Sequence, residues 1–185
     1  NKDNLVESWS VTLGSSYSSP VADLQRVYTT ESLGSDREQV TAYDRATGDL
    51  IWTQSWKGGM KVPFFAASNG SWIRSTPTLT HDKLIVMGMQ ERLLCLDADT
   101  GKILWQFNAP KELKTPEPSF GGVSSPMVDN GAVYVQAGGG LIKVDVETGK
   151  LIWSSVLSKD AMNQSPFGSP RIHDFGDSIQ LVTLG

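Results

Sequence analysis

One eleven-residue pattern occurs three times in this chain, and it constrains the fold more than any other feature. Each copy has an Asp-x-x-Thr-Gly segment and a tryptophan four residues after the glycine. The copies are residues 42–52, 95–105 and 143–153, so their glycines lie 53 and 48 residues apart. A period of this length is typical of stacked supersecondary units that bury one another's faces. Functional residues are then expected in the loops.

The Asp-x-x-Thr-Gly segment predicts a tight turn between two strands. The aspartate can accept hydrogen bonds from backbone N–H groups two or three residues on, and the glycine can take a positive φ. This turn chemistry explains the aspartates better than a metal or catalytic role does. The tryptophans that follow, Trp52, Trp105 and Trp153, are expected to fill the space between neighbouring sheets.

A second hairpin precedes each copy of the pattern. It opens at a serine or threonine before a proline, then continues through a polar turn into a β-rich run. The four openings are Ser18-Ser19-Pro20, Ser75-Thr76-Pro77, Ser124-Ser125-Pro126 and Gly168-Ser169-Pro170. One period therefore contains four antiparallel strands. Four-stranded units in series predict an all-β fold, a β-propeller whose blades surround a central channel.

The A-x-D-x-x-T-G-x-x-x-W pattern resembles the tryptophan-docking repeat of the pyrroloquinoline-quinone (PQQ)-like β-propellers. Cys95 and Lys143 replace the small first residue in two copies, ahead of the turn. That family includes quinoprotein alcohol and sugar dehydrogenases, the lipoprotein scaffold of outer-membrane protein assembly, and extracytoplasmic repeat proteins with no demonstrated chemistry. The resemblance implies a bacterial periplasmic or otherwise extracytoplasmic location, although no signal peptide is visible in this chain. It predicts the fold better than the function.

The chain is predicted to be a single partial propeller domain over residues 1–185. Three complete blades are expected, together with a closing strand of a preceding blade and half of a further blade. The expected ranges are 17–56, 74–108 and 122–156 for the blades, 167–185 for the partial blade and 5–12 for the closing strand, which contains Trp9. This is about half of the seven- or eight-bladed ring that the resemblance implies. Either missing blades lie in a longer chain, or two copies form a homodimer that closes the ring.

Composition narrows the classes of partner. The net charge of −4 gives no basic surface of the kind that binds nucleic acid. No apolar run approaches the roughly 18 residues of a membrane span. The lone Cys95 cannot form an intrachain disulfide and is expected to be a small buried hydrophobe. A protein or a polysaccharide is therefore the expected partner.

The loops that enter the first strands are the candidate binding surface, because they are long and share one face of the propeller. The residues just before the first strands are expected to line the mouth of the channel: Tyr17, Trp72, Arg74, Phe120 and Phe167. Aromatic rings and one arginine could stack on a flat ligand and pair with its carboxylate, as a quinone tricarboxylate or a sugar acid would require. The same residues could instead only plug the channel.

For the remaining candidate site residues, a structural role is expected rather than a catalytic or metal-binding one. Glu31, Asp36 and Glu38 could supply oxygen ligands to calcium, but they lack the spacing of a known loop motif, so a solvated acidic hairpin and no metal site are expected. His81 and His173 fall at or beside turns on the face opposite the mouth. No motif for a nucleophile elbow, a phosphate loop or a zinc site is present, and no catalytic residue is assigned.

Two functions from different classes remain. The first is a noncatalytic extracytoplasmic binding or scaffold protein that presents its loop face to a partner and needs no cofactor. The alternative is a PQQ- and calcium-dependent quinoprotein dehydrogenase of alcohols or sugars. Some family members have adjacent cysteines beside the quinone, whereas this chain has one cysteine in all. The binding protein is preferred, because the structural repeat residues are complete and no catalytic groups converge.

Overall fold

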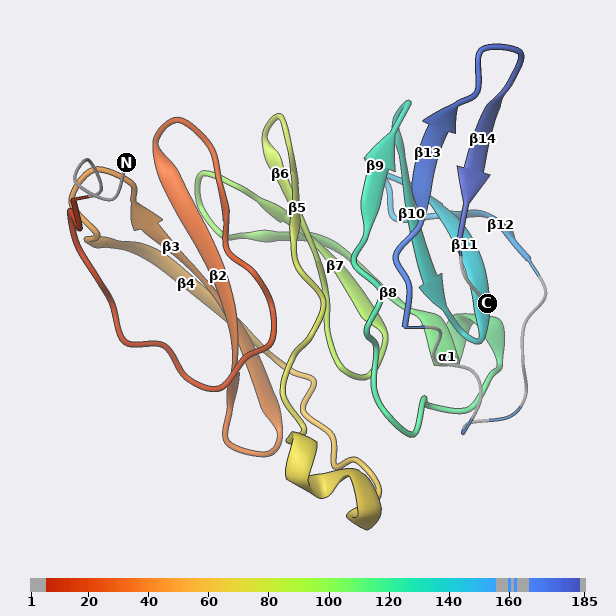
Figure 1. Cartoon of the computed structure of the whole chain (residues 1–185), viewed down its shortest axis with the longest axis horizontal. Helices are drawn as coiled ribbons and strands as arrows, with labels where there is room; N and C mark the ends of the chain where they lie inside the picture. Colours follow the sequence, from red (N-terminus) through yellow and green to blue (C-terminus); the bar gives the residue numbers. More distant parts are fainter. Residues whose placement is uncertain (1–5, 156–159, 161, 163–166, 184–185) are drawn as a thin grey trace.

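The computed structural model describes residues 6–155, 160, 162 and 167–183. In this part of the chain the strands form three four-stranded antiparallel sheets and one two-stranded sheet. Figure 1 shows the sheets fanned out in chain order, with the N-terminal sheet at the left. The prediction of an all-β partial propeller is confirmed.

Each complete sheet has its strands in chain order, so each is a simple meander. The first sheet contains β1 (Val21–Ala22), β2 (Arg26–Leu33), β3 (Arg37–Asp44) and β4 (Leu50–Lys57). The second contains β5 (Thr78–Thr80), β6 (Lys83–Met87), β7 (Arg92–Asp97) and β8 (Ile103–Asn108). The third contains β9 (Met127–Asp129), β10 (Ala132–Ala137), β11 (Gly140–Asp145) and β12 (Leu151–Ser154). The two-stranded sheet pairs β13 (Arg171–Asp174) with β14 (Ile179–Val182).

Among the described residues, two short helical segments interrupt the strand pattern, both in connections between sheets. The 3-10 helix η2 (Phe64–Asn69) follows β4, and α1 (Ala109–Leu113) follows β8. In the part of the chain that the structure describes, no helix has the length and apolar character needed to cross a membrane.

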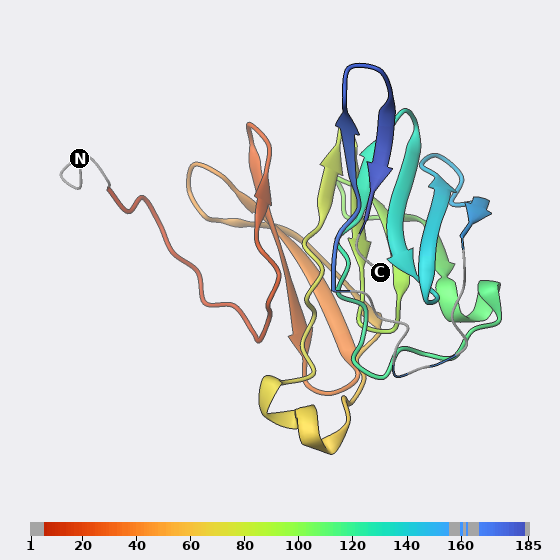
Figure 2. The ribbon, with the colours of Figure 1, turned by 45° about the vertical axis from the view of Figure 1, so that its right-hand side comes forward.

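The N-terminal segment differs from the expected closing strand. Residues 6–14 form no strand, and a single bridge joins Ser15 to Ser32. Figure 2 shows this segment on the outer side of the first sheet, where no described strand lies beside it to pair with. Three residues at the limits of the expected ranges lie outside the described residues: Leu5, Val156 and Gly185.

The Asp-x-x-Thr-Gly segments form the predicted turns. Asp97 accepts hydrogen bonds from the backbone N–H and the hydroxyl of Thr100 at 2.8 and 2.7 Å. Asp145 and Thr148 repeat both bonds at 2.8 and 2.7 Å. The threonine hydroxyl and N–H stabilise each carboxylate and hold the pKa of Asp97 and Asp145 below the usual value. These carboxylates therefore serve the turns.

Each of these turns receives a tryptophan from the part of the chain that precedes its sheet. Trp52 donates its indole N–H to the carbonyl of Ala98 at 3.1 Å. Its ring lies against Gly101, where a Cβ would come within 2.5 Å of the indole. Two equivalent contacts complete the pattern: Trp105 with Val146 and Gly149, and Trp9 with Arg45 and Gly48. The glycine is thus needed for its positive φ and for the approach of the ring.

Trp153 departs from this arrangement. Trp105 is 9% exposed, whereas Trp153 is 37% exposed. The Trp153 ring meets Tyr134 of its own sheet at a centroid distance of 6.3 Å, and the described residues of the fourth sheet include no Asp-x-x-Thr-Gly turn to receive it. The prediction that the pattern tryptophans fill the space between sheets is therefore confirmed for Trp105 and for the partly buried Trp52, and it is wrong for Trp153.

The hydrophobic core lies between the sheets. Leu84 and Val86 of β6 face the first sheet, whereas Ile85 and Met87 face the third. Both faces of β6 are buried, which accounts for its continuous apolar sequence. Cys95 is buried in the cluster between the second and third sheets, as predicted.

Candidate functional site

The residues before the first strands meet on one face of the molecule. We call the face with the connections between sheets the loop face (bottom of Figure 1), and the opposite one the turn face. A cavity of about 660 Å³ opens on the loop face. It is lined by Tyr17, Ala66, Asn69, Arg74, Phe120, Val123 and Phe167. Four of the five residues predicted for the mouth therefore line one cavity, and their use as ligand contacts stays a prediction.

Trp72, the fifth residue predicted for the mouth, is not among the residues that line the cavity. Its ring centroid is 5.3 Å from that of Tyr17. Gly70 makes room for the indole, because a Cβ there would lie 2.7 Å from it. The Tyr17 hydroxyl donates a hydrogen bond to the carbonyl of Asn69 at 2.8 Å. Trp72 thus supports Tyr17, and the cavity side of the wall is formed by the tyrosine.

The guanidinium of Arg74 is fixed at two points. It donates hydrogen bonds to the carbonyl of Phe120 and, at 2.9 Å, to that of Gly70. Its Cζ lies 5.9 Å from the centroid of the Tyr17 ring. Partial burial lowers the pKa of Arg74. A guanidinium has about five N–H donors, so donors beyond these two bonds are left for a ligand in the cavity.

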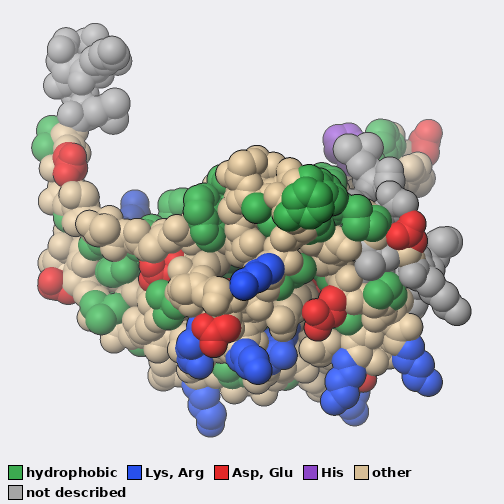
Figure 3. Space-filling model, turned by 90° about the horizontal axis from the view of Figure 1, so that it is seen from below, with side chains coloured by type: hydrophobic (Ala, Val, Ile, Leu, Met, Phe, Trp, Pro, Cys, Tyr) green, Lys and Arg blue, Asp and Glu red, His purple; other side chains and the backbone are tan. Residues whose placement is uncertain are grey.

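An exposed aromatic ridge borders this cavity, formed by Phe64, Phe65 and Phe120. Phe64 and Phe65 are 91% and 61% exposed, and no residue of η2 is buried. The ring centroids of Phe65 and Phe120 are 6.2 Å apart, so the ridge continues the cavity wall. Figure 3, which views the loop face, shows groups of hydrophobic side chains with Lys and Arg side chains along one side. Sequence reasoning placed this segment in a long loop but missed the ridge.

The glutamates near the loop face are buried, so the expected solvated acidic hairpin is wrong for two of its three residues. Glu31 and Glu38 are 8% and 0% exposed, and Asp36 at the turn is exposed. Neighbouring segments of the same chain cover both glutamate side chains and donate hydrogen bonds to them. Among the described residues no three His, Cys, Asp or Glu side chains are grouped so that they could hold a metal ion.

Two buried glutamates occupy one repeat position and join neighbouring sheets. Glu38 and Glu91 both lie six residues before the turn aspartate of their sheet. Glu38 accepts hydrogen bonds from the indole N–H of Trp56 and the backbone N–H of Met89, both at 2.8 Å. Glu91 accepts one from the backbone N–H of Gly138 at 2.8 Å. Burial raises the pKa of each carboxyl group to about 7, against the opposing effect of these bonds. This common position, six residues before the turn aspartate, was the feature of the sequence that could have identified Glu91.

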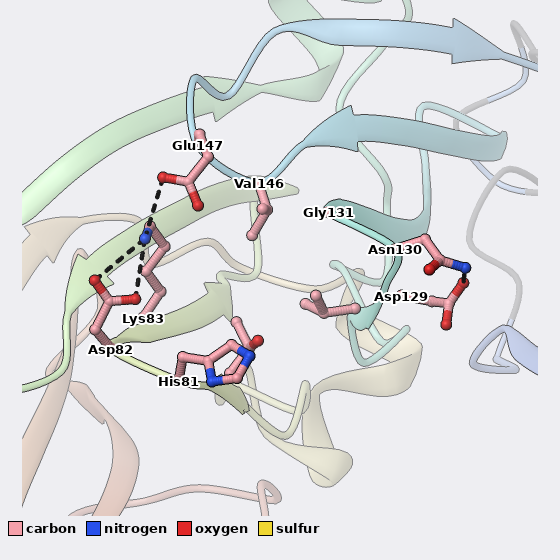
Figure 4. A pocket seen from close by; sticks show the side chains of 10 residues that line it. His81, Asp82, Lys83, Asp129, Asn130, Gly131, Val146 and Glu147 are labelled. Atoms are coloured by element: carbon pink, nitrogen blue, oxygen red, sulfur yellow. Dashed lines mark hydrogen bonds and ion pairs between the residues drawn. The ribbon is translucent and has the colours of Figure 1, made fainter.

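A second cavity, of about 470 Å³, opens on the turn face between the second and third sheets (Figure 4). Its polar side chains are Thr80, His81, Asp82, Lys83, Asp129, Asn130 and Glu147. Lys83 forms ion pairs with Asp82 at 3.0 Å and Glu147 at 3.2 Å, and Asn130 donates to Asp129 at 2.8 Å. His81 thus lies away from the mouth, as predicted, and His173 lies within β13. Most charges of this cavity are paired with one another.

Comparison with known proteins agrees with this geometry. A family model described as outer membrane protein assembly factor BamB matches residues 36–183. The chain belongs to this PQQ-like repeat family. The match covers β3 and β4 of the first sheet and all of the second, third and two-stranded sheets, so the family assignment rests on the repeats themselves.

Relatives in this family include two kinds of protein. BamB of Shewanella oneidensis is 26% identical over 113 residues, which are 60% of this chain and 26% of that protein. The dehydrogenase subunit of the quinone alcohol dehydrogenase of Gluconobacter oxydans is 31% identical over 126 residues, 62% of this chain and 16% of that one. The crystal structure of the quinohemoprotein alcohol dehydrogenase from Comamonas testosteroni matches with a TM-score of 0.56 at 25% identity, over 77% of this chain and 21% of that one. The chain thus spans about a quarter or less of these proteins.

The residues that line the cavity on the loop face suit a flat anion better than they suit calcium. Arg74 can pair with a carboxylate, and the aromatic rings can contact a flat molecule. Calcium takes six to eight oxygen ligands, typically including carboxylates. No described residue that lines the cavity has a carboxylate. Glu38 and Glu91 use oxygens to bind backbone N–H groups of the next sheet. The described residues that line this cavity therefore supply no carboxylate ligand for calcium.

Proposed function

We propose that this chain belongs to a noncatalytic, extracytoplasmic propeller that binds a protein or polysaccharide partner through its loop face. The observation that carries this proposal is the aromatic ridge, where Phe64 and Phe65 are 91% and 61% exposed beside an open cavity. Burying a phenylalanine side chain against a partner contributes roughly 2 kcal/mol. The relative named as an assembly factor supports a role without chemistry of its own.

Exposed cations on the loop face favour a partner with anionic groups, although the carboxylates of Asp36 and Glu112 are exposed there as well. Lys57 ends β4, Lys61 precedes η2, and both side chains are exposed. Lys111 and Lys114 are exposed at α1, in the next connection between sheets. Such cations raise the rate of encounter with an acidic protein segment or an acidic polysaccharide. The ridge would then supply the short-range contact.

A pair of photo-cross-linking variants tests the proposal. A photoreactive amino acid replaces Phe64 on the loop face or, as the matched control, Leu24, which is 90% exposed in the turn between β1 and β2. After irradiation in the native host, an adduct is expected from position 64 and none from position 24. Mass spectrometry identifies a protein adduct, and sugar analysis a polysaccharide adduct. Adducts from both positions, or none from position 64, would contradict a loop-face partner.

The alternative function is a PQQ- and calcium-dependent dehydrogenase of alcohols or sugars. It is supported by the 31% identity to the Gluconobacter oxydans dehydrogenase subunit and by Arg74, which lines the cavity and has N–H donors beyond its two hydrogen bonds. In that case Arg74→Ala weakens PQQ binding, whereas Lys102→Ala in the turn between β7 and β8 does not. The preferred function predicts the same lack of saturable PQQ binding in both variants and in the natural protein.

A further inference from the structure

A second layer of side chains lines the channel below the loop-face cavity. In extended chain, residues two positions apart point to the same side. Two residues after Tyr17, Arg74, Val123 and Phe167 come Ser19, Thr76, Ser125 and Ser169. These four residues line a separate cavity of about 400 Å³, which shares no residue with the loop-face cavity. All four segments therefore contribute a hydroxyl to one place.

Hydrogen bonds between sheets orient three of these hydroxyls. The backbone N–H of Ser19 donates to the hydroxyl of Thr76 at 3.1 Å, that of Thr76 to Ser125 at 3.0 Å, and that of Ser125 to Ser169 at 2.9 Å. A hydroxyl that accepts a bond still has its own proton to donate. Accepting a bond also polarises the O–H and strengthens it as a donor. The ladder thus leaves three hydroxyl donors at the channel.

One cation and no carboxylate accompany these hydroxyls. Arg171, the first residue of β13, lines the cavity, and its side chain forms no ion pair with another described residue. The other described lining residues are proline, threonine, methionine and valine. The described residues that line this cavity therefore offer hydrogen-bond donors and no carboxylate to accept from them. In the turn-face cavity, by contrast, most charged side chains are paired with one another.

We propose that this channel cavity binds an oxyanion, a sulfate, phosphate or carboxylate group, through the hydroxyls of Thr76, Ser125 and Ser169 and the guanidinium of Arg171. An oxyanion accepts several hydrogen bonds at once, and those with a charged partner are the strongest. The site draws one donor from each of three neighbouring segments, so it exists only when the sheets are assembled. It does not depend on the partner proposed for the loop face.

The test follows the backbone amide NMR signals of Thr76 and Ser125 in the full chain. Sulfate, phosphate and acetate are added separately at constant ionic strength, with chloride as the balancing anion. Saturable shifts at these amides are expected for at least one oxyanion, and the anion that saturates at the lowest concentration identifies the class. Arg171→Gln should weaken that affinity about tenfold. Lys102→Gln removes a cation from the turn face and should leave it unchanged.

A second variant examines the hydroxyls. Thr76→Val keeps the side-chain shape, removes the donor and should weaken affinity about fivefold, with circular dichroism to establish that the sheets persist. If Thr76→Val does not fold, the comparison of Arg171→Gln with Lys102→Gln decides alone. Shifts that do not saturate with any of the three anions, or equal affinities in those two variants, would overturn the proposal.

Discussion

The turn face and the loop face of this molecule use their polar and aromatic groups differently. On the turn face, aspartates accept bonds from their own turns, Lys83 pairs with Asp82 and Glu147, and tryptophans dock on glycines. On the loop face, the Phe64 side chain is exposed to solvent, and Arg74 has N–H donors beyond its two hydrogen bonds. The residues of the repeat pattern form the contacts that hold the turns and the sheets together. Recognition is therefore expected from the connections, which the repeat does not constrain.

The largest effect should come from removing a docked tryptophan. Trp105 is 9% exposed and donates to the carbonyl of Val146 at 2.9 Å, whereas Trp153 is 37% exposed. Trp105→Ala should lower the free energy of unfolding by about 4 kcal/mol, and Trp153→Ala by about 1 kcal/mol. Urea denaturation measures both. Equal losses would show that docking does not hold the sheets together.

A smaller effect is expected at the glycine that receives a tryptophan. Gly101 and Gly131 both have φ of 72°, but a Cβ on Gly101 would lie 2.5 Å from Trp52, and one on Gly131 would meet no atom within 4 Å. The left-handed backbone should cost about 1 kcal/mol in each alanine variant. Displacing the ring should bring Gly101→Ala to about 3 kcal/mol. Thermal unfolding of the two variants gives the comparison, and a greater loss in Gly131→Ala would refute it.

The buried glutamates predict how stability changes with pH. The pKa of Glu91 is about 7 in the folded chain and 4.5 as its ordinary value. The folded chain therefore holds this proton more tightly, so the stabilisation is complete below pH 4.5 and is lost as the pH rises through about 7. Glu38 behaves in the same way. Glu91→Gln can keep the bond from Gly138 and should remove about half of the fall in stability over this window.

Urea denaturation at several pH values from 4 to 8 measures this fall. Glu112→Gln, which removes an exposed carboxylate from α1, is the matched control and should leave the curve as it is in the natural chain. A Glu91→Gln curve that coincides with the control would argue against a burial-driven rise in the pKa of Glu91.

The smallest effect on stability is expected at the ridge. Phe64 is 91% exposed, and Phe64→Ser should change the free energy of unfolding by no more than about 0.5 kcal/mol. Leu24→Ser on the turn face serves as control. The Phe64 variant should lose the cross-linked partner, whereas the Leu24 variant should keep it. A loss of stability above about 1 kcal/mol at Phe64 would place the ridge in the fold.

How far the sequence could predict the molecule depends on how local each signal is. The turn at Asp97 rests on chemistry within five residues, and strand order alone brings Arg74 to the mouth. The burial of Glu38 could not be predicted, because it depends on Met89 of the next sheet, 51 residues away. The exposure of Phe64 could not be predicted either, since it depends on how η2 lies against the rest of the chain.

The most direct test of the central claim, that the loop face binds a partner without redox chemistry, is a spectral titration of PQQ with calcium into the complete natural protein. Dye reduction with alcohols and aldoses follows in the same cuvette. The account predicts no saturable PQQ binding and no substrate-dependent dye reduction by the folded protein. Saturable binding that Arg74→Ala weakens, together with dye reduction, would contradict it and establish a quinoprotein dehydrogenase.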